Sequence, residues 1–208
     1  GLLSGGLVIY DRGHFSSPAF ADTIAYESVH GLFADSAGYT YLCTSLGTFV
    51  ERDGKATLLP GLPEQPRAGF TAPDGTVYFN ALSLVRYDAQ NDTGVTIVPG
   101  AGEVHALADI ILEKDHRFLA SRLGQIQRYR MNPDGPASLE ETFRTPGALR
   151  LLRDGDEGYF VGTIGYGVIY FDGKHFSYPH GLGVRRGAGR QTHALMRGAE
   201  GSLWATSS

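Results

Sequence analysis

Basic side chains recur at one place in a pattern that repeats along these 208 residues. Counting back eight residues from one turn in each repeat reaches His30, Arg67, Ala108, Arg150 and His193. Three more arginines precede the last of these residues, namely Arg185, Arg186 and Arg190. A ring of such groups around an opening predicts a site for an anionic ligand, because guanidinium groups bind carboxylate, sulfate or phosphate through paired hydrogen bonds. The alternative is structural: these side chains bond to backbone carbonyls or to nearby carboxylates.

Carboxylates lie about three residues before that place in the repeat. They are Glu27, Glu64 and, approximately, Glu103. Two carboxylates that face one pocket can cleave a glycosidic bond. An enzymatic site would therefore be assembled from Glu27, Glu64, His30 and His193. Ion pairs, such as Glu64 with Arg67, and solvated linker residues are the other interpretations.

Tyr166 lies between two glycines in "TIGYG", a loop between two strands. An exposed aromatic ring there could stack on a sugar or another flat ligand, or pack on a neighbouring loop. Four aspartates fall in or beside turns, where Asp bonds its own backbone. We expect structural roles for these, which are Asp35, Asp74, Asp154 and Asp156. Cys43 in "TYLCTS" and Trp204 are expected to be buried.

The elements that position these residues follow from the repeat. Its turns are anchored on Gly38, Gly75, His116, Gly158 and Gly201, which are 37 to 43 residues apart. Each anchor lies between two apolar segments, and a second pair of segments follows around a turn rich in Asp, Gly and Asn. A unit of four short strands with this period is typical of a β-propeller blade.

The sequence therefore predicts an all-β fold, a single propeller domain of five four-stranded blades without a substantial α-helix. The expected blade units are approximately 29–64, 65–103, 104–147, 148–190 and, as the fifth, 191–208 together with 1–28. The fifth combines both termini because "SGGLVIYDRGHFSS" matches "GYGVIYFDGKHFSY", the second half of the preceding blade. Such closure would hide two exposed sheet edges. The alternative is an arc of a larger ring, of which a seven-bladed one is favoured.

Composition excludes several classes of partner. A formal net charge of −4 gives no electrostatic basis for binding nucleic acid, and a single cysteine cannot form an internal disulfide. The sequence contains no metal-ligand spacing, phosphate-binding loop or catalytic serine motif. No apolar run approaches the roughly 20 residues of a membrane helix. We therefore expect no cofactor, no metal and no membrane contact within this segment.

Three stretches, "EGSLWATSS", "EGYFVGTIGYGVIYFDGKHF" and "SGGLVIYDRGHF", resemble the two-component-regulator propeller repeat, whose pattern is "DREGNLWIGT…GGLYRYD". Two others, "DSAGYTYLCTSLGTFVERDG" and "PDGTVYFNALSLVRYD", resemble it more loosely, so the resemblance covers nearly the whole chain. It implies a periplasmic or extracellular sensor region of a bacterial hybrid histidine kinase or a related signalling protein. Some members of this family detect carbohydrate fragments.

On this basis the predicted function is non-enzymatic binding of a small ligand, either anionic or a carbohydrate, at the top face of the propeller channel. By top face we mean the end of each blade at which its innermost strand begins. The predicted ligand-binding residues are His30, Arg67, Arg150, His193, Tyr166, Arg185 and Arg186. Further propeller repeats or a signalling domain in the parent protein are the expected protein partners. The alternative function is a glycosidase or lyase that uses the glutamates and histidines named above.

Overall fold

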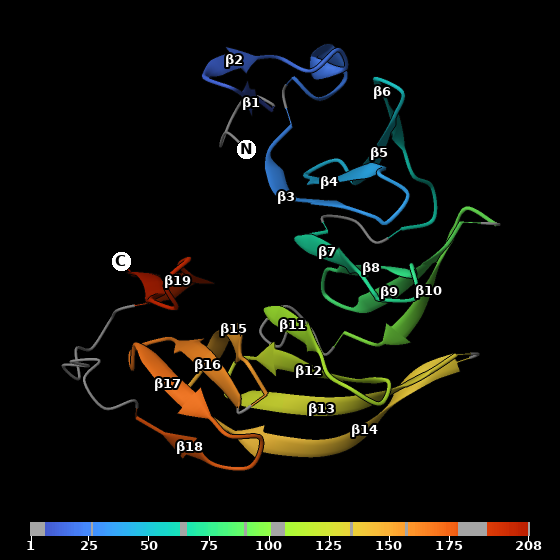
Figure 1. The fold of residues 1–208 in the computed structure, drawn as a ribbon. Coiled ribbons are helices and arrows are strands. Elements are labelled where there is room, and N and C mark those ends of the chain that lie inside the picture. Colours follow the sequence, from blue (N-terminus) through green and yellow to red (C-terminus); the bar gives the residue numbers. More distant parts are fainter. Residues whose placement is uncertain are drawn as a thin grey trace. The chain divides into compact units, whose positions relative to one another are not determined.

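The computed structural model describes residues 7–25, 27–62, 66–89, 91–100, 107–133, 135–156, 158–178 and 191–207. The chain divides into two compact units, residues 1–100 and residues 101–208. In the described residues of both units the regular elements are β-strands, apart from one 3-10 helix, η1 (Ala21–Ile24). This confirms the prediction of an all-β fold (Figure 1).

The first unit contains a hairpin and two four-stranded antiparallel sheets. The hairpin consists of β1 (Ile9–Asp11) and β2 (His14–Ser16). The first sheet consists of β3 (Val29–Ala34), β4 (Thr40–Thr44), β5 (Thr48–Arg52) and β6 (Lys55–Leu58). The second consists of β7 (Ala68–Thr71), β8 (Val77–Asn80), β9 (Leu84–Asp88) and β10 (Thr93–Val98). In each sheet every strand pairs with its neighbours in the sequence, which is the arrangement of a propeller blade.

The second unit has the same organisation. One blade consists of β11 (Asp109–Leu112), β12 (Arg117–Arg122), β13 (Gln125–Asn132) and β14 (Gly135–Arg144). The next consists of β15 (Ala148–Asp154), β16 (Gly158–Thr163), β17 (Val168–Phe171) and β18 (Phe176–Ser177). A two-stranded sheet follows, made of β19 (Thr192–Arg197) and β20 (Leu203–Ser207). The described residues thus form four blades, and because each terminal strand pair is a separate sheet, the predicted fifth blade is not confirmed.

The second strand of each blade is mostly buried because both of its faces are covered. In β4 and β8 almost every residue is buried, and β16 is similar. The outermost strand β14, in contrast, is mostly exposed and carries Ser, Glu and Thr. The sequence therefore positions each blade by burying its middle strands and leaving its outer edge polar.

The turn between the first and second strands of a blade, called here the a–b turn, is closed by aspartate and glycine. Asp35 Oδ1 accepts hydrogen bonds from the backbone N–H groups of Ala37 (2.9 Å) and Tyr39 (3.0 Å). Gly38 has a φ of +87°, a left-handed conformation that glycine adopts without strain. Asp74 Oδ1 likewise accepts the N–H of Thr76. These contacts agree with the structural role expected for Asp35 and Asp74, whereas Asp154 and Asp156 form ion pairs with Arg197 and Lys114.

Aromatic side chains hold the two blades of the first unit together. Phe33 stacks on Tyr41 with ring centroids 5.0 Å apart, and the edge of Phe79 meets both rings at 5.6 and 5.7 Å. Phe79 is fully buried, as is Cys43, for which burial was predicted. Gly69 is required beside them, because a Cβ there would lie 2.2 Å from the ring of Phe33.

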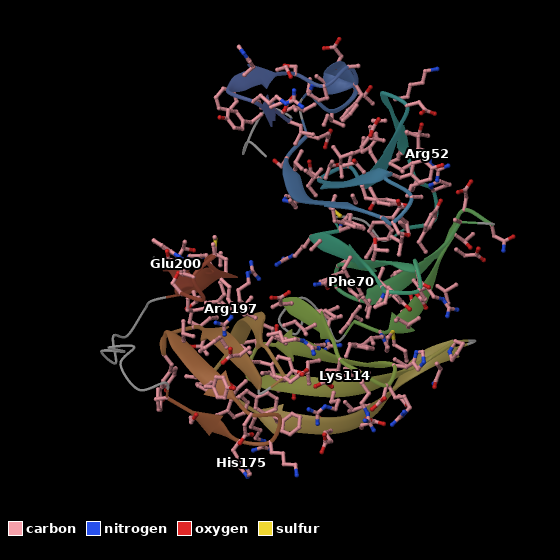
Figure 2. The ribbon with its side chains drawn as sticks, in the orientation of Figure 1. Arg52, Phe70, Lys114, His175, Arg197 and Glu200 are labelled. Atoms are coloured by element: carbon pink, nitrogen blue, oxygen red, sulfur yellow. The ribbon has the colours of Figure 1, made fainter. Side chains whose placement is uncertain are left out.

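The blades of the second unit pack through aliphatic residues and Phe171, with ion pairs added. Leu119 and Ile126 of one blade share a core with Val161 and Phe171 of the next. Arg197 of β19, labelled in Figure 2, forms an ion pair with Asp154 of β15. A charged contact therefore joins β19 to the β15–β18 blade, and an apolar core joins that blade to β11–β14.

Candidate functional site

The top end of each innermost strand begins with an irregularity that fixes which residues are equivalent. In β3, β15 and β19 a bulge shifts the register, and the residue passed over is His30, Leu149 and His193, respectively. In β7 and β11 the equivalent residue lies just before the strand. The backbone N–H of Arg67 donates to the carbonyl of Asn80, which is the pairing partner of Ala68. The backbone N–H of Ala108 likewise donates to the carbonyl of Ser121, which is the pairing partner of Asp109.

Four of the five residues predicted to be equivalent do occupy equivalent strand positions, namely His30, Arg67, Ala108 and His193. The fifth, Arg150, lies one residue away from that position. Leu149, not Arg150, is equivalent to His30, Arg67 and His193. Arg150 pairs with Gly162 as Gly31 pairs with Cys43, twelve residues away in both blades, but Gly158 lies eight residues after Arg150 whereas Gly38 lies seven after Gly31. Counting back eight residues from Gly158 therefore stops one residue short. Neighbouring residues on a strand point to opposite faces, which makes a displacement of one residue consequential.

His30, Arg67 and His193 all have exposed side chains. In the first unit, His30 and Arg67 lie on adjacent strands whose backbones touch, since a Cβ on Gly31 would be 2.7 Å from the carbonyl oxygen of Arg67. The structure thus brings two of the predicted cationic residues to one place. Their action on a ligand stays a prediction.

Arg150 is used by the protein itself. Its Nε donates to the carbonyl oxygen of His193 (2.7 Å), and its Nη1 donates to the carbonyls of Ala108 (3.2 Å) and Leu149 (3.0 Å). These three carbonyls belong to equivalent positions of three successive inner strands. Arg150 therefore ties the top ends of β11, β15 and β19 together, which is the structural alternative considered for the basic ring.

Asp109 is a residue of this region that the sequence analysis did not single out. It occupies the position equivalent to Arg150 in the preceding blade and accepts the N–H groups of Leu151 (2.8 Å) and Ile110 (2.9 Å). Burial raises the pKa of the Asp109 carboxyl, and the two backbone hydrogen bonds and Arg150 oppose that shift. An isolated Asp between apolar residues gives no sequence signal for this role, because its partner is 42 residues away.

Tyr166 lies in the β16–β17 turn, and its side chain is 41% exposed. The same turn contacts the start of β19, because Thr192 Oγ1 donates to Gly167 O at 3.2 Å. Tyr166 is therefore carried by the top end of the second unit, where Arg150 and His193 also lie. Arg185 and Arg186 lie outside the described residues, as do Arg190, Glu64 and Glu103.

Glu27 belongs to the top end of the first unit. Its Oε2 accepts a hydrogen bond of 2.6 Å from Ser45 Oγ, and Ser45 Oγ in turn accepts the N–H of Ser28. The carboxylate thus closes a loop beside the β4–β5 turn.

Trp204, expected in the core, is 62% exposed, since no third strand pairs with β20 in the part of the chain that the structure describes.

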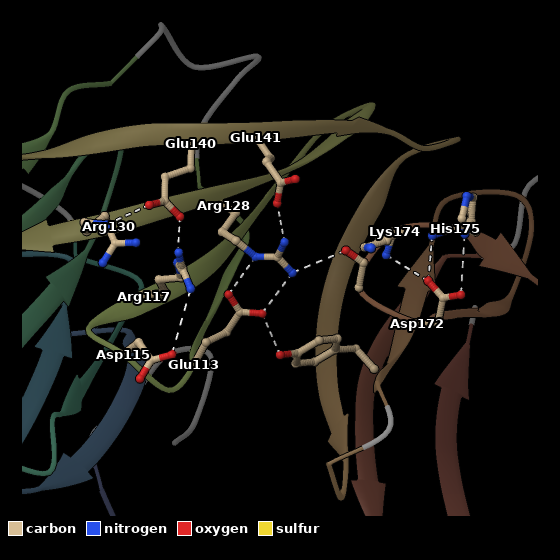
Figure 3. Close-up of polar contacts among 12 residues, drawn as sticks. Glu113, Asp115, Arg117, Arg128, Arg130, Glu140, Glu141, Asp172, Lys174 and His175 are labelled. Carbon is tan, nitrogen blue, oxygen red and sulfur yellow. Dashed lines mark hydrogen bonds and ion pairs between the residues drawn. The ribbon is translucent and has the colours of Figure 1, made fainter.

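A cavity of about 460 Å³ opens at the opposite end of the second unit, beside the a–b turns. It is lined by Glu113, Lys114, Asp115, Arg117, Arg128, Glu140, Glu141, Arg153, Asp156 and Tyr159. Arg128 occupies the centre of this network (Figure 3). Its Nε and Nη2 donate to Glu113 at 2.8 and 3.2 Å, and its Nη1 donates to Glu141. Tyr159 donates to Glu113 Oε1 at 2.7 Å from the neighbouring blade.

Burial and charge act together on the groups of this network. Burial raises the pKa of Tyr159 to about 12, and its hydrogen bond to Glu113 adds to the shift. Burial by itself would lower the pKa of Arg128, but the hydrogen bonds to Glu113 and Glu141 outweigh it, so that pKa is raised. Both groups keep their protons at neutral pH, which makes them hydrogen-bond donors and not bases.

The described residues present no activated nucleophile. Burial raises the pKa of Cys43 to about 12, so its thiol stays protonated at neutral pH. Groups of three or more His, Cys, Asp or Glu side chains that could hold a metal ion do not occur in this part of the chain. In the same residues, no helix is long and apolar enough to cross a membrane.

The chain resembles solved structures of β-propellers. It superposes on the extracellular domain of a protein described as a hybrid two-component system from B. thetaiotaomicron with a TM-score of 0.75, at 14% identity over 98% of this chain and 29% of that chain. A second extracellular domain from that organism, described as part of a one-component system, gives 0.74 at 17% identity over 98% and 28%. This chain thus spans less than a third of those domains. Virginiamycin B lyase from Staphylococcus aureus gives 0.63 at 14% identity, over 86% of this chain and 62% of the lyase.

At such low sequence identities, the structural superpositions establish the fold alone. The resemblance to two-component sensor propellers that the repeats indicated is confirmed at that level. A scan of the sequence against protein-family models found no match, and a search among curated proteins found none either.

Proposed function

We propose that this chain is a non-enzymatic, ligand-binding propeller segment of a bacterial sensor, acting in the periplasm or outside the cell. One observation carries the proposal: basic side chains project from equivalent positions at the top ends of the inner strands. His30, Arg67 and His193 are exposed there. The fold shared with extracellular sensor domains supports the assignment to signalling.

The proposed ligand is small and carries an anionic group, and an acidic oligosaccharide has that chemistry. In the first unit, His30 and Arg67 would supply the charge. In the second unit, His193 would supply charge, Tyr166 would stack on a flat ring, and Arg150 would mainly hold the strand ends. Arg185 and Arg186 belong to the same proposal on sequence grounds. Further propeller repeats or a signalling domain of the parent protein would receive the signal.

The test is calorimetric titration of the chain with a trimer of uronic acid, and with a neutral trimer of glucose as the comparison. Arg67→Gln should weaken uronate binding about tenfold or more, because a hydrogen bond between charged groups contributes about 1.5–3 kcal/mol. Lys55→Gln, at an exposed position of β6, is the matched control. Binding should also weaken with added salt. Unchanged affinity of Arg67→Gln for uronate would contradict the site.

A lyase or glycosidase is the alternative function, favoured by the shared fold with virginiamycin B lyase. Glu27 and His30 would act in the first unit and His193 in the second. Incubation with the same acidic trimer distinguishes the two functions. Product formation that is lost in Glu27→Gln or His193→Asn would support the enzyme and contradict the sensor.

We also propose that 191–208 and 1–28 complete a fifth blade. The pairing of Tyr10 with Phe15 in β1–β2 repeats that of Phe171 with Phe176 in β17–β18. Phe171 is fully buried, whereas Tyr10 is 64% and Phe15 is 76% exposed. Trp204 is 62% exposed. Apolar side chains of this kind on both terminal sheets favour a common blade that would cover them.

Cysteine cross-linking tests this closure. By analogy with Val161 and Ile169 of the neighbouring blade, Ala205 should lie opposite Val8. The double variant Val8→Cys/Ala205→Cys should form an intramolecular disulfide, since directly paired strand residues have the required spacing. Each single variant is the control. Cross-links only between chains would support the arc of a larger ring instead.

A further inference from the structure

The charged cavity at the a–b turn end of the second unit is the strongest feature that the proposed function does not use. It lies between the blades β11–β14 and β15–β18, away from the top-end residues. Its volume of about 460 Å³ falls in the range of small-molecule sites. Because Tyr159 is the one residue without a formal charge among the described residues that line it, the cavity selects for polar ligands.

Two carboxylates of this cavity, Glu113 and Glu140, already have cationic partners. Glu113 accepts two hydrogen bonds from Arg128 and one from Tyr159. Glu140 accepts one from Arg117 Nε and one from Arg130 Nε, both at 2.7 Å (Figure 3). A cation would have to displace a guanidinium from each of them. The cavity is therefore poorly suited to a metal ion or an ammonium group.

Its cations, in contrast, retain unused donors among the described residues. Lys114 Nζ has three N–H groups and makes one hydrogen bond, to Asp156 at 2.9 Å. Arg117 uses Nε, and its Nη1 is 3.9 Å from Asp115, too far for a hydrogen bond. Arg153 uses Nη2 on the carbonyl of Leu112 and lies over the ring of Tyr159. Each of these three cations thus retains N–H groups that can donate to a ligand.

We infer that this cavity binds a compact oxyanion, a phosphate, sulfate or carboxylate group held by Lys114, Arg117 and Arg153. An oxyanion offers several acceptor oxygens to donors that converge from two blades, from the β11–β12 turn, β12 and β15. The ion would link the blades where Lys114 and Asp156 already do. The nearby carboxylates oppose anion binding, so affinity is modest and falls as salt is added.

The test is titration of the whole chain with inorganic phosphate at low ionic strength, followed by amide chemical shifts. Shifts should centre on 113–117 and 153–159. Lys114→Gln should reduce affinity several-fold, and Lys114→Gln/Arg117→Gln should abolish saturable binding. Lys174→Gln, outside the cavity lining, is the matched control and should bind as the parent chain does. The single variant keeps the test valid should the double variant fail to fold, because Lys114 is 75% exposed.

Parallel titrations with sulfate and with glucuronate identify the favoured oxyanion. The proposal is overturned if Lys114→Gln binds each ion as the parent does, or if none of the three ions shifts those amides. It is also overturned if Arg67→Gln abolishes the binding and Lys114→Gln does not, which would assign the ion to the top-end site. Failure of the Arg67→Gln test alone would contradict the proposed function and leave this cavity unaffected.

Discussion

The two pairs of blades use the same topology and different chemistry at their interfaces. Between β3–β6 and β7–β10, Phe33, Tyr41 and Phe79 pack ring against ring. Between β11–β14 and β15–β18, an apolar core is joined by a charged layer around Arg128 and Glu113. Aromatic side chains pack against one another at the density of a protein interior. Charged side chains that keep contact with solvent pack less closely and leave a cavity between them. The comparison teaches that the second unit can have a cavity because its interface is ionic at one end.

The largest effect should come from the aromatic interface. Phe79→Ala should lower the free energy of unfolding by about 3–5 kcal/mol, because it removes a fully buried ring and leaves a cavity. Urea denaturation measures this loss. Leu32→Ala is the control on β3, where the side chain is 53% exposed, and should change stability by no more than about 0.5 kcal/mol. Equal losses in the two variants would show that the rings do not dominate this interface.

Breaking the charged layer should lower the free energy of unfolding by less than the loss of the aromatic ring, but still measurably. Glu113→Gln should cost about 2–3 kcal/mol, somewhat below the value for breaking a fully buried ion pair. The reason is that Arg128 loses its best partner while its side chain is only 16% exposed. Glu141→Gln is the matched control, since Glu141 bonds the same guanidinium but is 48% exposed, and it should cost clearly less. A larger loss in the control would mean that burial does not set the strength of this layer.

A single hydrogen bond across the charged layer gives a smaller effect. Tyr159→Phe keeps the ring and removes the hydroxyl that donates to Glu113, so it should cost about 1–2 kcal/mol. Denaturation compares it with Tyr166→Phe, whose exposed hydroxyl should contribute nothing measurable. A spectrophotometric titration should show Tyr159 ionising near its pKa of about 12. Ionisation close to pH 10 would contradict the buried, hydrogen-bonded phenol.

Acidification should loosen the second unit gradually. A hydrogen bond from Arg117 lowers the pKa of Glu140, one from Lys114 lowers that of Asp156, and the N–H of His175 lowers that of Asp172. A lowered folded-state pKa stabilises the protein above the unfolded value, about 4, and that stability is lost as pH falls through the folded pKa. Asp109, whose pKa is raised by burial, opposes this trend.

Hydrogen exchange in β11–β18 between pH 6 and pH 3 measures the loss, corrected for intrinsic exchange. Glu140→Gln should flatten the profile, because it removes one titrating partner of Arg117. An unchanged profile in that variant would rule out Glu140 as a contributor. Of the four predictions this effect is the smallest, because these carboxylates lie at the surface and are screened by salt.

The strands and turns were predictable because their signals are local. The spacing of the anchors, the apolar runs of β4, β8 and β16 and the Asp and Gly residues of the a–b turns depend on residues close together in the sequence. The place of His30, Arg67 and His193 at the start of inner strands followed from the same repeat. Arg150 was misplaced by one residue because Gly158 was aligned with Gly38 although it lies one residue later relative to the paired strands, which only the strand register reveals.

The sequence by itself determined the blade repeat, the all-β class and the basic character of the top ends, since each follows from period and residue type. Tertiary structure decided what those residues do. It directed Arg150 to the carbonyls of Ala108 and His193, more than 40 positions apart from it, and brought Tyr159 to Glu113. Such contacts join different blades, and their geometry depends on how one sheet packs on the next. No local pattern records that packing, because it is fixed by the shapes of both surfaces together.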